Sequence, residues 1–350
     1  MLTYVPGRRV QSELTSLEIC AGAGGQALGL EQAGFSHLAL VEIDAFACAT
    51  LRHNRPQWNV LQADLRDFSA RQFRGQVDLF AGGVPCPPFS RAGKQLGHED
   101  DRDLFPAALR LIAECEPKAV MLENVRGLLD PVFDDYREAI NTRLRSMGFA
   151  PCWRLLHASD YGVPQLRPRV VCVAIADEYA GHFQWPAPDP SRTPSIGEFL
   201  RDDMSAGGWL GADDWARRAE GIAPTLVGGS KKHGGPDLGP TRARKAWAAL
   251  GVDGGTLADG PPPPDLSGLP RLSVQMAAKI QGFPPHWQFV GRKTHAYRQV
   301  GNAFPPPVAR AVGAAIRSAL QQGTVTCKNF QVKLWPSENP VPETSFVSIS

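Results

Sequence analysis

The sequence predicts an α/β fold in which helices cover both faces of a mainly parallel sheet. Two observations support this prediction. From about residue 16 to residue 176, short apolar runs alternate with amphipathic stretches, and a glycine-rich turn follows the first run. This alternation is typical of units in which a crossover helix returns the chain to a parallel strand. The runs expected to form strands span 14–22, 38–44, 59–64, 77–83, 118–125 and 169–175.

The chain divides where its composition changes. After Trp185 the strand pattern stops and Pro, Gly, Trp and charged residues dominate, with WPAPDP at one border and GPPPPD at the other. Helical patterning returns in SVQMAAKIQGF and PVARAVGAAIRSAL. We therefore expect a large domain over 1–185, a smaller domain over 186–270, a return to the first domain over 271–325, and a tail of unknown role over 326–350.

Composition argues against several classes of protein. The 350 residues carry 37 Lys and Arg against 35 Asp and Glu, a net charge of +2, which does not by itself indicate a partner. Seven cysteines without a CxxC pair argue against a disulfide framework and a zinc ribbon, and no metal site is expected. No apolar run approaches the ~18 residues of a membrane span, and no hydrophobic leader opens the chain. We expect a soluble, cytoplasmic protein that does not contact a membrane.

One stretch is locally basic. Residues 231–245, KKHGGPDLGPTRARK, contain five Lys and Arg and a single Asp. Such a cluster suits contacts to phosphate groups, although a solvated loop can have the same composition.

The turn after the first expected strand fits a nucleotide-binding pattern. Gly22, Gly24 and Ala27 match G-x-G-x-x-A, and Glu42 ends the next strand. Glycines let the backbone approach a ligand, and a carboxylate at the second strand can bind ribose hydroxyls. Asp64 ends the third strand and could accept a hydrogen bond from an adenine amino group. This pattern suits a nicotinamide, a flavin or S-adenosylmethionine equally well.

The stretch GGVPCPPFS, residues 82–90, places one cysteine between prolines. The run QVDLFAGG before it reads as a buried strand that two glycines end. Prolines on both sides of Cys86 fix φ and remove amide donors, so the segment continues neither as strand nor as helix. We expect a rigid loop that presents a thiol at the carboxyl end of a strand, where open α/β sheets place their sites.

Together, these stretches resemble the DNA cytosine-5 methyltransferase family over residues 16–318. The stretches that match, in the family's order, are GAGG at 22–25, Glu42, Asp64, GGVPCPPFS at 82–90, ENV at 123–125, QLRPR at 165–169 and GNAFPP at 301–306. The resemblance implies a Rossmann-like domain that binds S-adenosylmethionine and a smaller target-recognition domain over 186–270. The reaction it implies is methyl transfer to C5 of a cytosine flipped out of a specific double-stranded DNA sequence.

The resemblance also gives each motif a chemical role. Cytosine C5 is a poor nucleophile, so a thiolate that adds to C6 must supply electron density, and Cys86 is the implied nucleophile. Glu123 would meet the charge that develops at N3, because a buried carboxyl can hold a proton there. Arg167 or Arg169 would bind the O2 atom of the base.

Further contacts follow from the same resemblance. The implied cofactor contacts are Cys20, Ala23, Gly24, Gly25, Glu42, Ile43, Asp64, Leu65, Gly83, Pro85 and Asn302. The implied DNA contacts are Ser90 and Lys94, in a polar stretch over 90–103 that resembles the family's mobile loop, together with Gln165, Thr225, Lys231, Lys232, Arg242 and Arg244. We expect a monomer on DNA, associated with the nucleoid, and a cognate restriction endonuclease that acts separately.

Some positions depart from the family pattern, and other functions compete with it. The family often has Phe where Cys20 stands and a bulky aromatic where Ile43 stands, and Gln275 and Met276 replace a usual Arg-Glu pair. A tRNA methyltransferase of the same family would carry a Cys-Phe-Thr signature, which this sequence lacks. Intact Cys86 and Glu123 argue against a catalytically silent DNA-binding regulator. A nicotinamide oxidoreductase would leave the Pro-Cys segment without a role.

Overall fold

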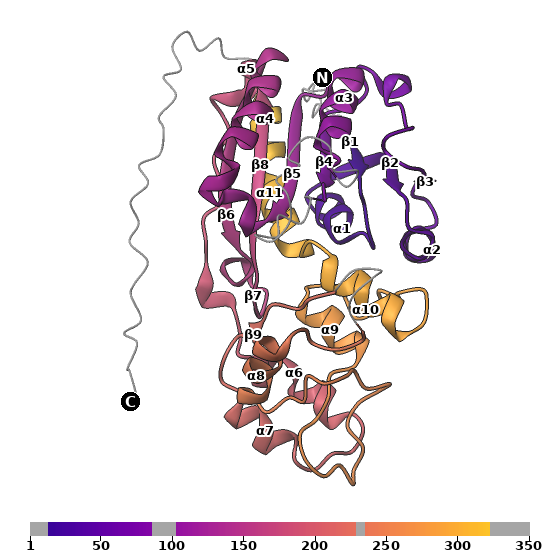
Figure 1. The fold of residues 1–350 in the computed structure, drawn as a ribbon, viewed down its shortest axis with the longest axis vertical. Helices are drawn as coiled ribbons and strands as arrows, with labels where there is room; N and C mark the ends of the chain where they lie inside the picture. Colours follow the sequence, from indigo (N-terminus) through magenta and orange to yellow (C-terminus); the bar gives the residue numbers. More distant parts are fainter. Residues whose placement is uncertain (1–12, 86–102, 229–234, 323–350) are drawn as a thin grey trace, which may run out of the picture.

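A twisted sheet of seven strands forms the centre of the larger lobe (Figure 1). The computed structural model describes residues 13–85, 103–228 and 235–322. The strands, in the spatial order β3-β2-β1-β4-β5-β8-β6, are β3 (Val60–Gln62), β2 (Phe35–Glu42), β1 (Leu14–Ile19), β4 (Leu79–Gly83), β5 (Ala119–Val125), β8 (Pro168–Ala176) and β6 (Phe149–His157). β1 to β5 pair in parallel, and β8 is antiparallel to both β5 and β6. The predicted α/β class is confirmed.

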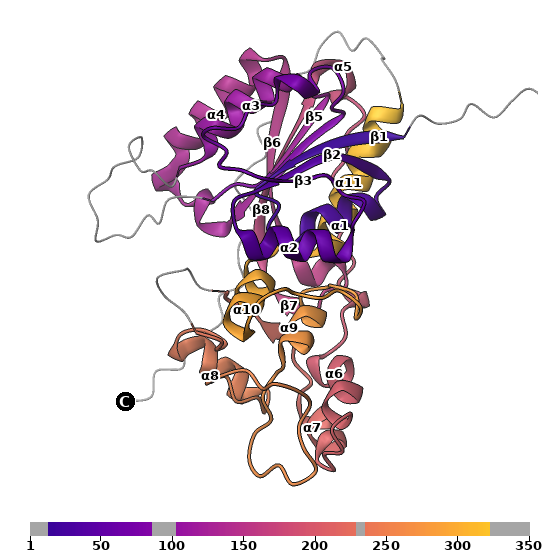
Figure 2. The same cartoon turned by 90° about the vertical axis from the view of Figure 1, so that its right-hand side faces the viewer.

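Helices cover both faces of this sheet, as Figure 2 shows. One face carries α3 (Phe105–Cys115) and α4 (Asp134–Ser146), and the other carries α1 (Gly25–Gln32) packed against α11 (Pro306–Gln321). Strand β4 shows why both faces need cover. Phe80 enters the core beneath α3 and α4, whereas Leu79 and Ala81 enter the core beneath α1 and α11. A strand that is buried on both sides reads as a continuous apolar run.

Strand β6 is absent from the expected set, although the other six sheet strands overlap the predicted runs. Its sequence FAPCWRLLH includes Pro151, and only Phe149 and Leu156 are buried, because β6 is the outermost strand beside β8. An edge strand needs neither an apolar run nor a complete set of amide donors. The signal that revealed the buried strands is therefore missing here.

The smaller lobe lies at one end of the sheet. It comprises α6 (Ile196–Ser205), α7 (Ala212–Arg218), β9 (Ala223–Pro224) and α8 (Thr241–Ala249), whereas α9 (Val274–Ile280) and α10 (Lys293–Asn302) belong to the returning chain and lie between this lobe and the sheet. β9 pairs in parallel with the two-residue strand β7 (Gln165–Leu166). The remaining helices within the described ranges are α2 (Ala45–Asn54), α5 (Asp177–Ala180) and the 3-10 turns η1 (Arg71–Phe73), η2 (Arg126–Leu129), η3 (Pro131–Phe133), η4 (Ala158–Tyr161) and η5 (Pro190–Arg192).

The two lobes share one hydrophobic core. Trp215 and Trp247 of the smaller lobe belong to the same buried cluster as Trp287 and as Leu28 and Leu51 from α1 and α2. A continuous core limits independent movement, because sliding the lobes would expose apolar surface. The shared core therefore fixes the position of the smaller lobe relative to the carboxyl ends of the strands. No helix in the described ranges is both long enough and apolar enough to span a bilayer.

Candidate active site

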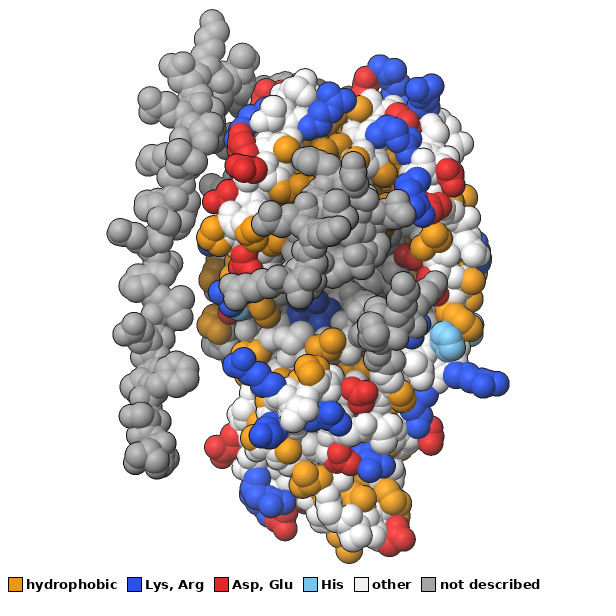
Figure 3. Space-filling view, in the orientation of Figure 1, with side chains coloured by type: hydrophobic (Ala, Val, Ile, Leu, Met, Phe, Trp, Pro, Cys, Tyr) orange, Lys and Arg blue, Asp and Glu red, His pale blue; other side chains and the backbone are white. Residues whose placement is uncertain are grey.

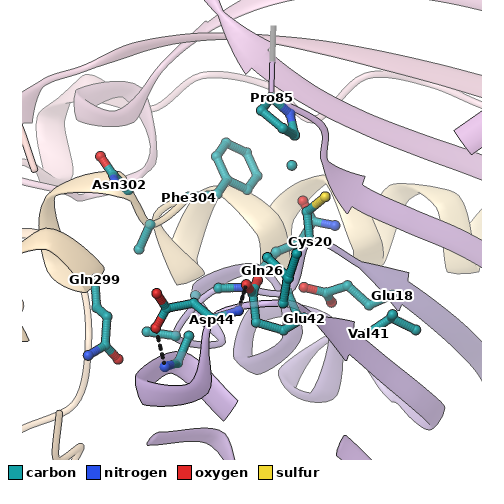
Figure 4. Close-up of a pocket in the computed structure, with 18 of the residues that line it drawn as sticks. Glu18, Cys20, Gln26, Val41, Glu42, Asp44, Pro85, Gln299, Asn302 and Phe304 are labelled. Atoms are coloured by element: carbon teal, nitrogen blue, oxygen red, sulfur yellow. Dashed lines mark hydrogen bonds between the residues drawn. The ribbon is translucent and has the colours of Figure 1, made fainter. Parts of the chain in front are cut away.

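A cleft of about 600 Å³ opens at the carboxyl ends of β1, β2, β3 and β4. Figure 4 shows its walls: strand ends and the turn before α1 on one side, and α10 with the segment after it on the other. The predicted cofactor residues that line it are Cys20, Ala23, Gly25, Glu42, Ile43, Asp64, Leu65, Gly83, Pro85 and Asn302. Residues far apart in the sequence thus meet in one cavity.

The glycine turn has the backbone shape that the pattern predicts. Gly22 and Gly24 have φ values of +53° and +88°, in the left-handed region that favours glycine. A Cβ on Gly25 would lie 2.2 Å from the Phe304 carbonyl oxygen, so only glycine allows the start of α1 to approach this segment. Cys20 has φ of +48°, an uncommon conformation for a residue with a side chain.

The prediction that Gly24 contacts the cofactor is not supported, because Gly24 does not line the cleft. Its amide donates to the Ala21 carbonyl oxygen at 3.0 Å, and a Cβ on it would lie 2.7 Å from Leu51 Cδ2. A side chain at residue 24 would therefore point into the core rather than toward a ligand. Its role is to close the turn that presents its neighbours.

Glu42 is oriented by the backbone around it. Its two carboxylate oxygens accept hydrogen bonds from the amides of Gly22 and Asp44, each at 2.7 Å. Asp44 in turn caps α2 by accepting from the Phe46 amide at 2.9 Å. A carboxylate fixed in this way at the end of the second strand keeps lone pairs for a diol. Glu42 therefore fits a ribose.

Asp64 and Leu65 form the adjoining wall. Both carboxylate oxygens of Asp64 lie within 3.1 Å of the Arg66 guanidinium Nε. Hydrogen bonds from Arg66 lower the pKa of Asp64 to about 2, so the group is ionised at neutral pH. Ile43, which stands where a bulky aromatic was expected, is 58 % exposed beside them. An exposed apolar side chain at a cavity rim suits contact with a flat ring.

Two buried side chains in the cleft have polar atoms without a hydrogen-bond partner among the described residues. Gln26 is 4 % exposed, and neither its amide oxygen nor its amide nitrogen has a hydrogen-bond partner. One oxygen of Glu18, which is 1 % exposed, is also unpartnered. Such groups are costly unless a ligand or water satisfies them. The donor and acceptor set of the cleft therefore fits a polar cofactor, and sequence patterns alone did not single out Glu18 or Gln26.

Burial of Glu18 predicts a dependence of stability on pH. Desolvation raises its pKa well above the ordinary value of 4.5. The native state therefore binds more protons than the unfolded state above that value, and stability falls as pH rises. We expect Glu18→Gln to raise the melting temperature of the cofactor-free protein by about 2–4 °C at pH 8. The gain should shrink as the pH approaches 4.5 in thermal unfolding. A gain of equal size at every pH would contradict this account.

The far wall of the cleft is one face of α10. His295, Arg298, Gln299 and Asn302 line the cavity, and their spacing of three and four residues places them on one side of the helix. Ala296, Tyr297 and Val300 on the opposite side are buried in the core. The sequence motifs pointed only to Asn302. The helical spacing in HAYRQVGN was a signal for the other three.

A buried ion pair lies at the inner end of the cleft. Glu123 on β5 pairs with Arg169 on β8, with Arg169 Nε 2.8 Å from Glu123 Oε1 and side-chain exposures of 12 % and 14 %. Burial raises the pKa of Glu123 above its ordinary value, while Arg169 and Arg167 act in the opposite direction. Gly83 lies opposite Glu123 in the ladder, and a Cβ there would come within 3.1 Å of Glu123 Oε2.

The same region anchors the chain that leads into Cys86. Asn124 Nδ2 donates to the Val84 carbonyl oxygen at 2.9 Å, and Pro85 lines the cleft together with Glu123. Cys86, Ser90 and Lys94 lie outside the described residues. Glu123 and the last residue before Cys86 thus line the cavity that the glycine turn also lines.

Two predicted functional residues are structural instead. Arg167 is 0 % exposed, and its guanidinium donates to the carbonyl oxygens of Leu226 at 2.7 Å and Gly301 at 2.8 Å. Gln165 is also 0 % exposed, and its amide bonds Gln281 and the Leu226 amide. A side chain that is buried in the core and bonded to groups there does not reach a base or a phosphate. The predictions of a base contact by Arg167 and a DNA contact by Gln165 are therefore wrong.

Three of the other predicted DNA contacts, Thr225, Arg242 and Arg244, lie on the smaller lobe. Thr225 follows β9 and donates its hydroxyl to the Leu166 carbonyl oxygen. Arg242 and Arg244 are both exposed on α8, two residues apart, and Figure 3 shows Lys and Arg side chains spread over this lobe. Lys231 and Lys232 lie outside the described residues.

The order of the strands and the place of the cleft at their carboxyl ends define a Rossmann-like fold. Among solved structures with this fold, an Entamoeba histolytica methyltransferase, EhMeth, matches with a TM-score of 0.63 at 15 % identity, over 89 % of this chain and 99 % of that one. A DNMT2 mutant from Spodoptera frugiperda matches with a TM-score of 0.62 at 18 % identity, over 87 % and 99 %. The chain belongs to the C-5 cytosine-specific DNA methylase family, whose model matches residues 14–318.

Two relatives are much more similar in sequence. The type II methyltransferase M.NaeI of Lentzea aerocolonigenes is 57 % identical over 313 residues, which span 88 % of this chain and 75 % of that protein. The type II methyltransferase M.NgoMIV of Neisseria gonorrhoeae is 54 % identical over 313 residues, which span 89 % and 99 %. The chain is thus a DNA cytosine-5 methyltransferase of the restriction-modification type, and the predicted family is confirmed.

Proposed function

We propose that this methyltransferase acts on C5 of a cytosine flipped out of a specific double-stranded DNA sequence, through a transient covalent bond between Cys86 and C6. One observation carries the proposal: Glu123 and Pro85 line the same cleft as the glycine turn and Glu42. A single cavity therefore joins a site for a nucleoside cofactor to the buried carboxyl and to the residue that precedes the thiol.

The cleft suits S-adenosylmethionine, which when bound supplies an electrophilic methyl group. Glu42 would bind the ribose hydroxyls, Ile43 and Leu65 would contact the adenine ring, and Asp64 would accept from its amino group. Asn302 and the unpartnered amide of Gln26 line the rest of the cavity. The cofactor-binding roles of these residues rest on their place in the cleft and on the chemistry of their side chains.

The proposed chemistry divides between three side chains. The Cys86 thiolate adds to C6, so that electron density moves toward C5 and N3 of the ring. Glu123 holds a proton at N3, a role that its raised pKa favours, because a neutral carboxyl can donate near neutral pH. Arg169 orients Glu123 and is the arginine available to O2. After C5 is methylated, its hydrogen leaves as a proton to water, and the electron pair of the C–H bond re-forms the double bond between C5 and C6 as the thiolate departs. The proton at N3 then returns to Glu123.

The mechanism can be tested by trapping the covalent complex. A duplex with 5-fluorocytosine at the target position should stall the reaction after methyl transfer, because fluorine cannot leave C5 as a cation. We expect a protein-DNA adduct that survives denaturing electrophoresis, requires S-adenosylmethionine and maps to the peptide containing GGVPCPPFS. Normal methylation of the unmodified duplex without any trapped adduct would exclude the thiolate mechanism.

The target-recognition role proposed for residues 186–270 predicts a change in salt dependence. Arg242 and Arg244 are exposed on α8, and we propose that they contact phosphates. Replacing both with Ala should weaken DNA binding and reduce the slope of log affinity against log salt by about one for each phosphate that is no longer bound. Arg217→Ala on α7 is the matched control, because Arg217 is exposed but paired with Asp214. An unchanged slope in the double variant would place the DNA elsewhere.

The biological setting is part of the same proposal. The naming of the relatives M.NaeI and M.NgoMIV as type II methyltransferases supports a cognate restriction endonuclease that recognises the same sequence and acts separately. We propose a monomer on DNA, located with the nucleoid in the cytoplasm. Methylation-sensitive sequencing of DNA from cells that express the gene would identify the sequence.

A further inference from the structure

A buried polar network crosses the boundary between the two lobes. We call it the Gln281 network, and it consists of the side chains of Gln165, Arg167 and Gln281 with the backbone groups of Leu226, Gly301 and Ala303. All three side chains belong to residues that are 0 % exposed. They bring together distant stretches of chain, with Arg167 and Ala303 separated by 136 positions in the sequence.

The hydrogen bonds of the network run without interruption from one lobe to the other. The Leu226 amide donates to Gln165 Oε1 at 2.9 Å, and Gln165 Nε2 donates to Gln281 Oε1 at 2.7 Å. Gln281 Nε2 donates in turn to the Ala303 carbonyl oxygen. Arg167 makes a parallel connection, because it donates to the carbonyl oxygens of Leu226 at 2.7 Å and Ala303 at 3.1 Å.

Each end of the network adjoins a functional surface. Leu226 lies between Thr225, a predicted DNA contact, and Val227, which is 42 % exposed. At the other end, the residue between Gly301 and Ala303 is Asn302, which lines the cofactor cleft. The recognition stretch 225–228 is therefore bonded through buried groups to both neighbours of a cofactor residue.

Close backbone packing reinforces this connection. A Cβ on Gly301 would lie 2.3 Å from the Gly228 amide nitrogen, and a Cβ on Gly228 would lie 2.7 Å from Asn302 Oδ1. Two glycines thus allow the stretch 225–228 to pack directly on the end of α10. Neither segment can shift relative to the other without breaking buried hydrogen bonds, which leaves polar groups unpaired.

We infer that the Gln281 network couples DNA recognition to cofactor binding, with Gln281 as a positioning residue. DNA contacts order the stretch 225–228, and the network transmits this order to Gly301 and Ala303, which flank Asn302. Cofactor then binds a wall that is already ordered, so its affinity rises. By linkage, the cofactor raises DNA affinity by the same factor. The inference rests on the proposed function, because it requires that one chain bind both ligands.

The coupling can be measured as a ratio of dissociation constants. S-adenosylhomocysteine, the demethylated form of the cofactor, is titrated calorimetrically into the full chain. One titration is done without DNA and one with a duplex that carries the sequence recognised by the enzyme. We expect the duplex to tighten binding to the wild-type protein by about 5-fold or more. Gln281→Met conserves volume but removes both amide bonds, and should reduce this factor to less than about 2-fold. Cofactor affinity without DNA should change much less.

A matched control and a second variant make the test decisive. Gln275→Met is the same substitution on α9 outside the network, where the Gln275 side chain donates to the Pro285 carbonyl oxygen, and it should keep the wild-type ratio. Gln165→Glu keeps the acceptor used by Leu226 and Arg167 but removes the donor to Gln281. Gln165→Glu should also abolish the coupling, and the same ratio measured on this variant tests the inference if Gln281→Met does not fold.

The outcomes separate the coupling from the function itself. A wild-type ratio near one, or an unchanged ratio in a folded Gln281→Met or Gln165→Glu protein, overturns the coupling. In either case the wild-type protein should still methylate the duplex. Failure of the wild-type protein to bind S-adenosylhomocysteine or to methylate DNA would instead overturn the proposed function.

Discussion

Cys86→Ser should abolish methyl transfer and leave DNA binding intact. A serine hydroxyl is far less ionised than a thiol near neutral pH, so addition to C6 should become too slow to support turnover. We expect the rate to fall by about 10³-fold or more, a decrease typical of removing a nucleophile. Single-turnover transfer of a radioactive methyl group measures the rate, and a gel shift with the recognition duplex measures binding.

The control for this substitution is another cysteine. Cys152 lies on edge strand β6, where its thiol donates to the Val173 carbonyl oxygen at 3.2 Å, and Cys152 does not line the cleft. The control variant is Cys152→Ser. It makes the same chemical change away from the site and should retain activity. Turnover by Cys86→Ser near the wild-type rate would show that Cys86 is not the nucleophile.

The second large effect is expected from Glu123→Gln, which keeps the shape of the side chain but removes its titratable proton. Removal of a positioned general acid should lower the rate of methyl transfer by about 10²-fold or more. Binding of S-adenosylhomocysteine should be nearly unchanged, because Glu42 and α10 carry the proposed cofactor contacts. Rapid-quench measurement of the first turnover separates this chemical step from product release.

The pH profile gives a further readout for the same variant. The pKa of Glu123 is raised, so the neutral carboxyl persists above the ordinary range and is lost as pH rises through the raised value. A thiolate nucleophile becomes more abundant as pH rises. The wild-type rate should therefore rise and then fall with pH, whereas the rate of Glu123→Gln should only rise. A falling limb that persists in the variant would assign that limb to another group.

Many features of this protein follow from local sequence. The buried strands read as apolar runs, and the positive φ values of Gly22 and Gly24 are those that a glycine turn before a helix requires. Glu42 and Asp64 lie in the cleft because the carboxyl ends of parallel strands meet at one edge of the sheet. The order of these motifs was sufficient to identify the family.

The two arginines of QLRPR show where local sequence stops being informative. Both are cations near Glu123, yet Arg169 lies on β8 and pairs with it, whereas Arg167 lies between β7 and β8 and enters the core. Strand alternation does not continue across that break, so spacing could not assign the two side chains to different surroundings. The partners of Arg167 come from residues 226, 301 and 303, which only the folded chain brings near.

The sequence by itself therefore determined the fold class, the family and the edge of the sheet where the cleft opens, and it predicts Cys86 and Glu123 as catalytic residues. Tertiary structure alone decided that Gln165 and Arg167 are structural, that one face of α10 forms the cleft wall, and that both lobes share a core. The physical reason is the range of the interactions. Turns and strand ends depend on neighbouring residues, whereas burial of a guanidinium or an amide depends on acceptors that are distant in the chain, 59 positions away for Arg167 and Leu226 and 116 for Gln165 and Gln281.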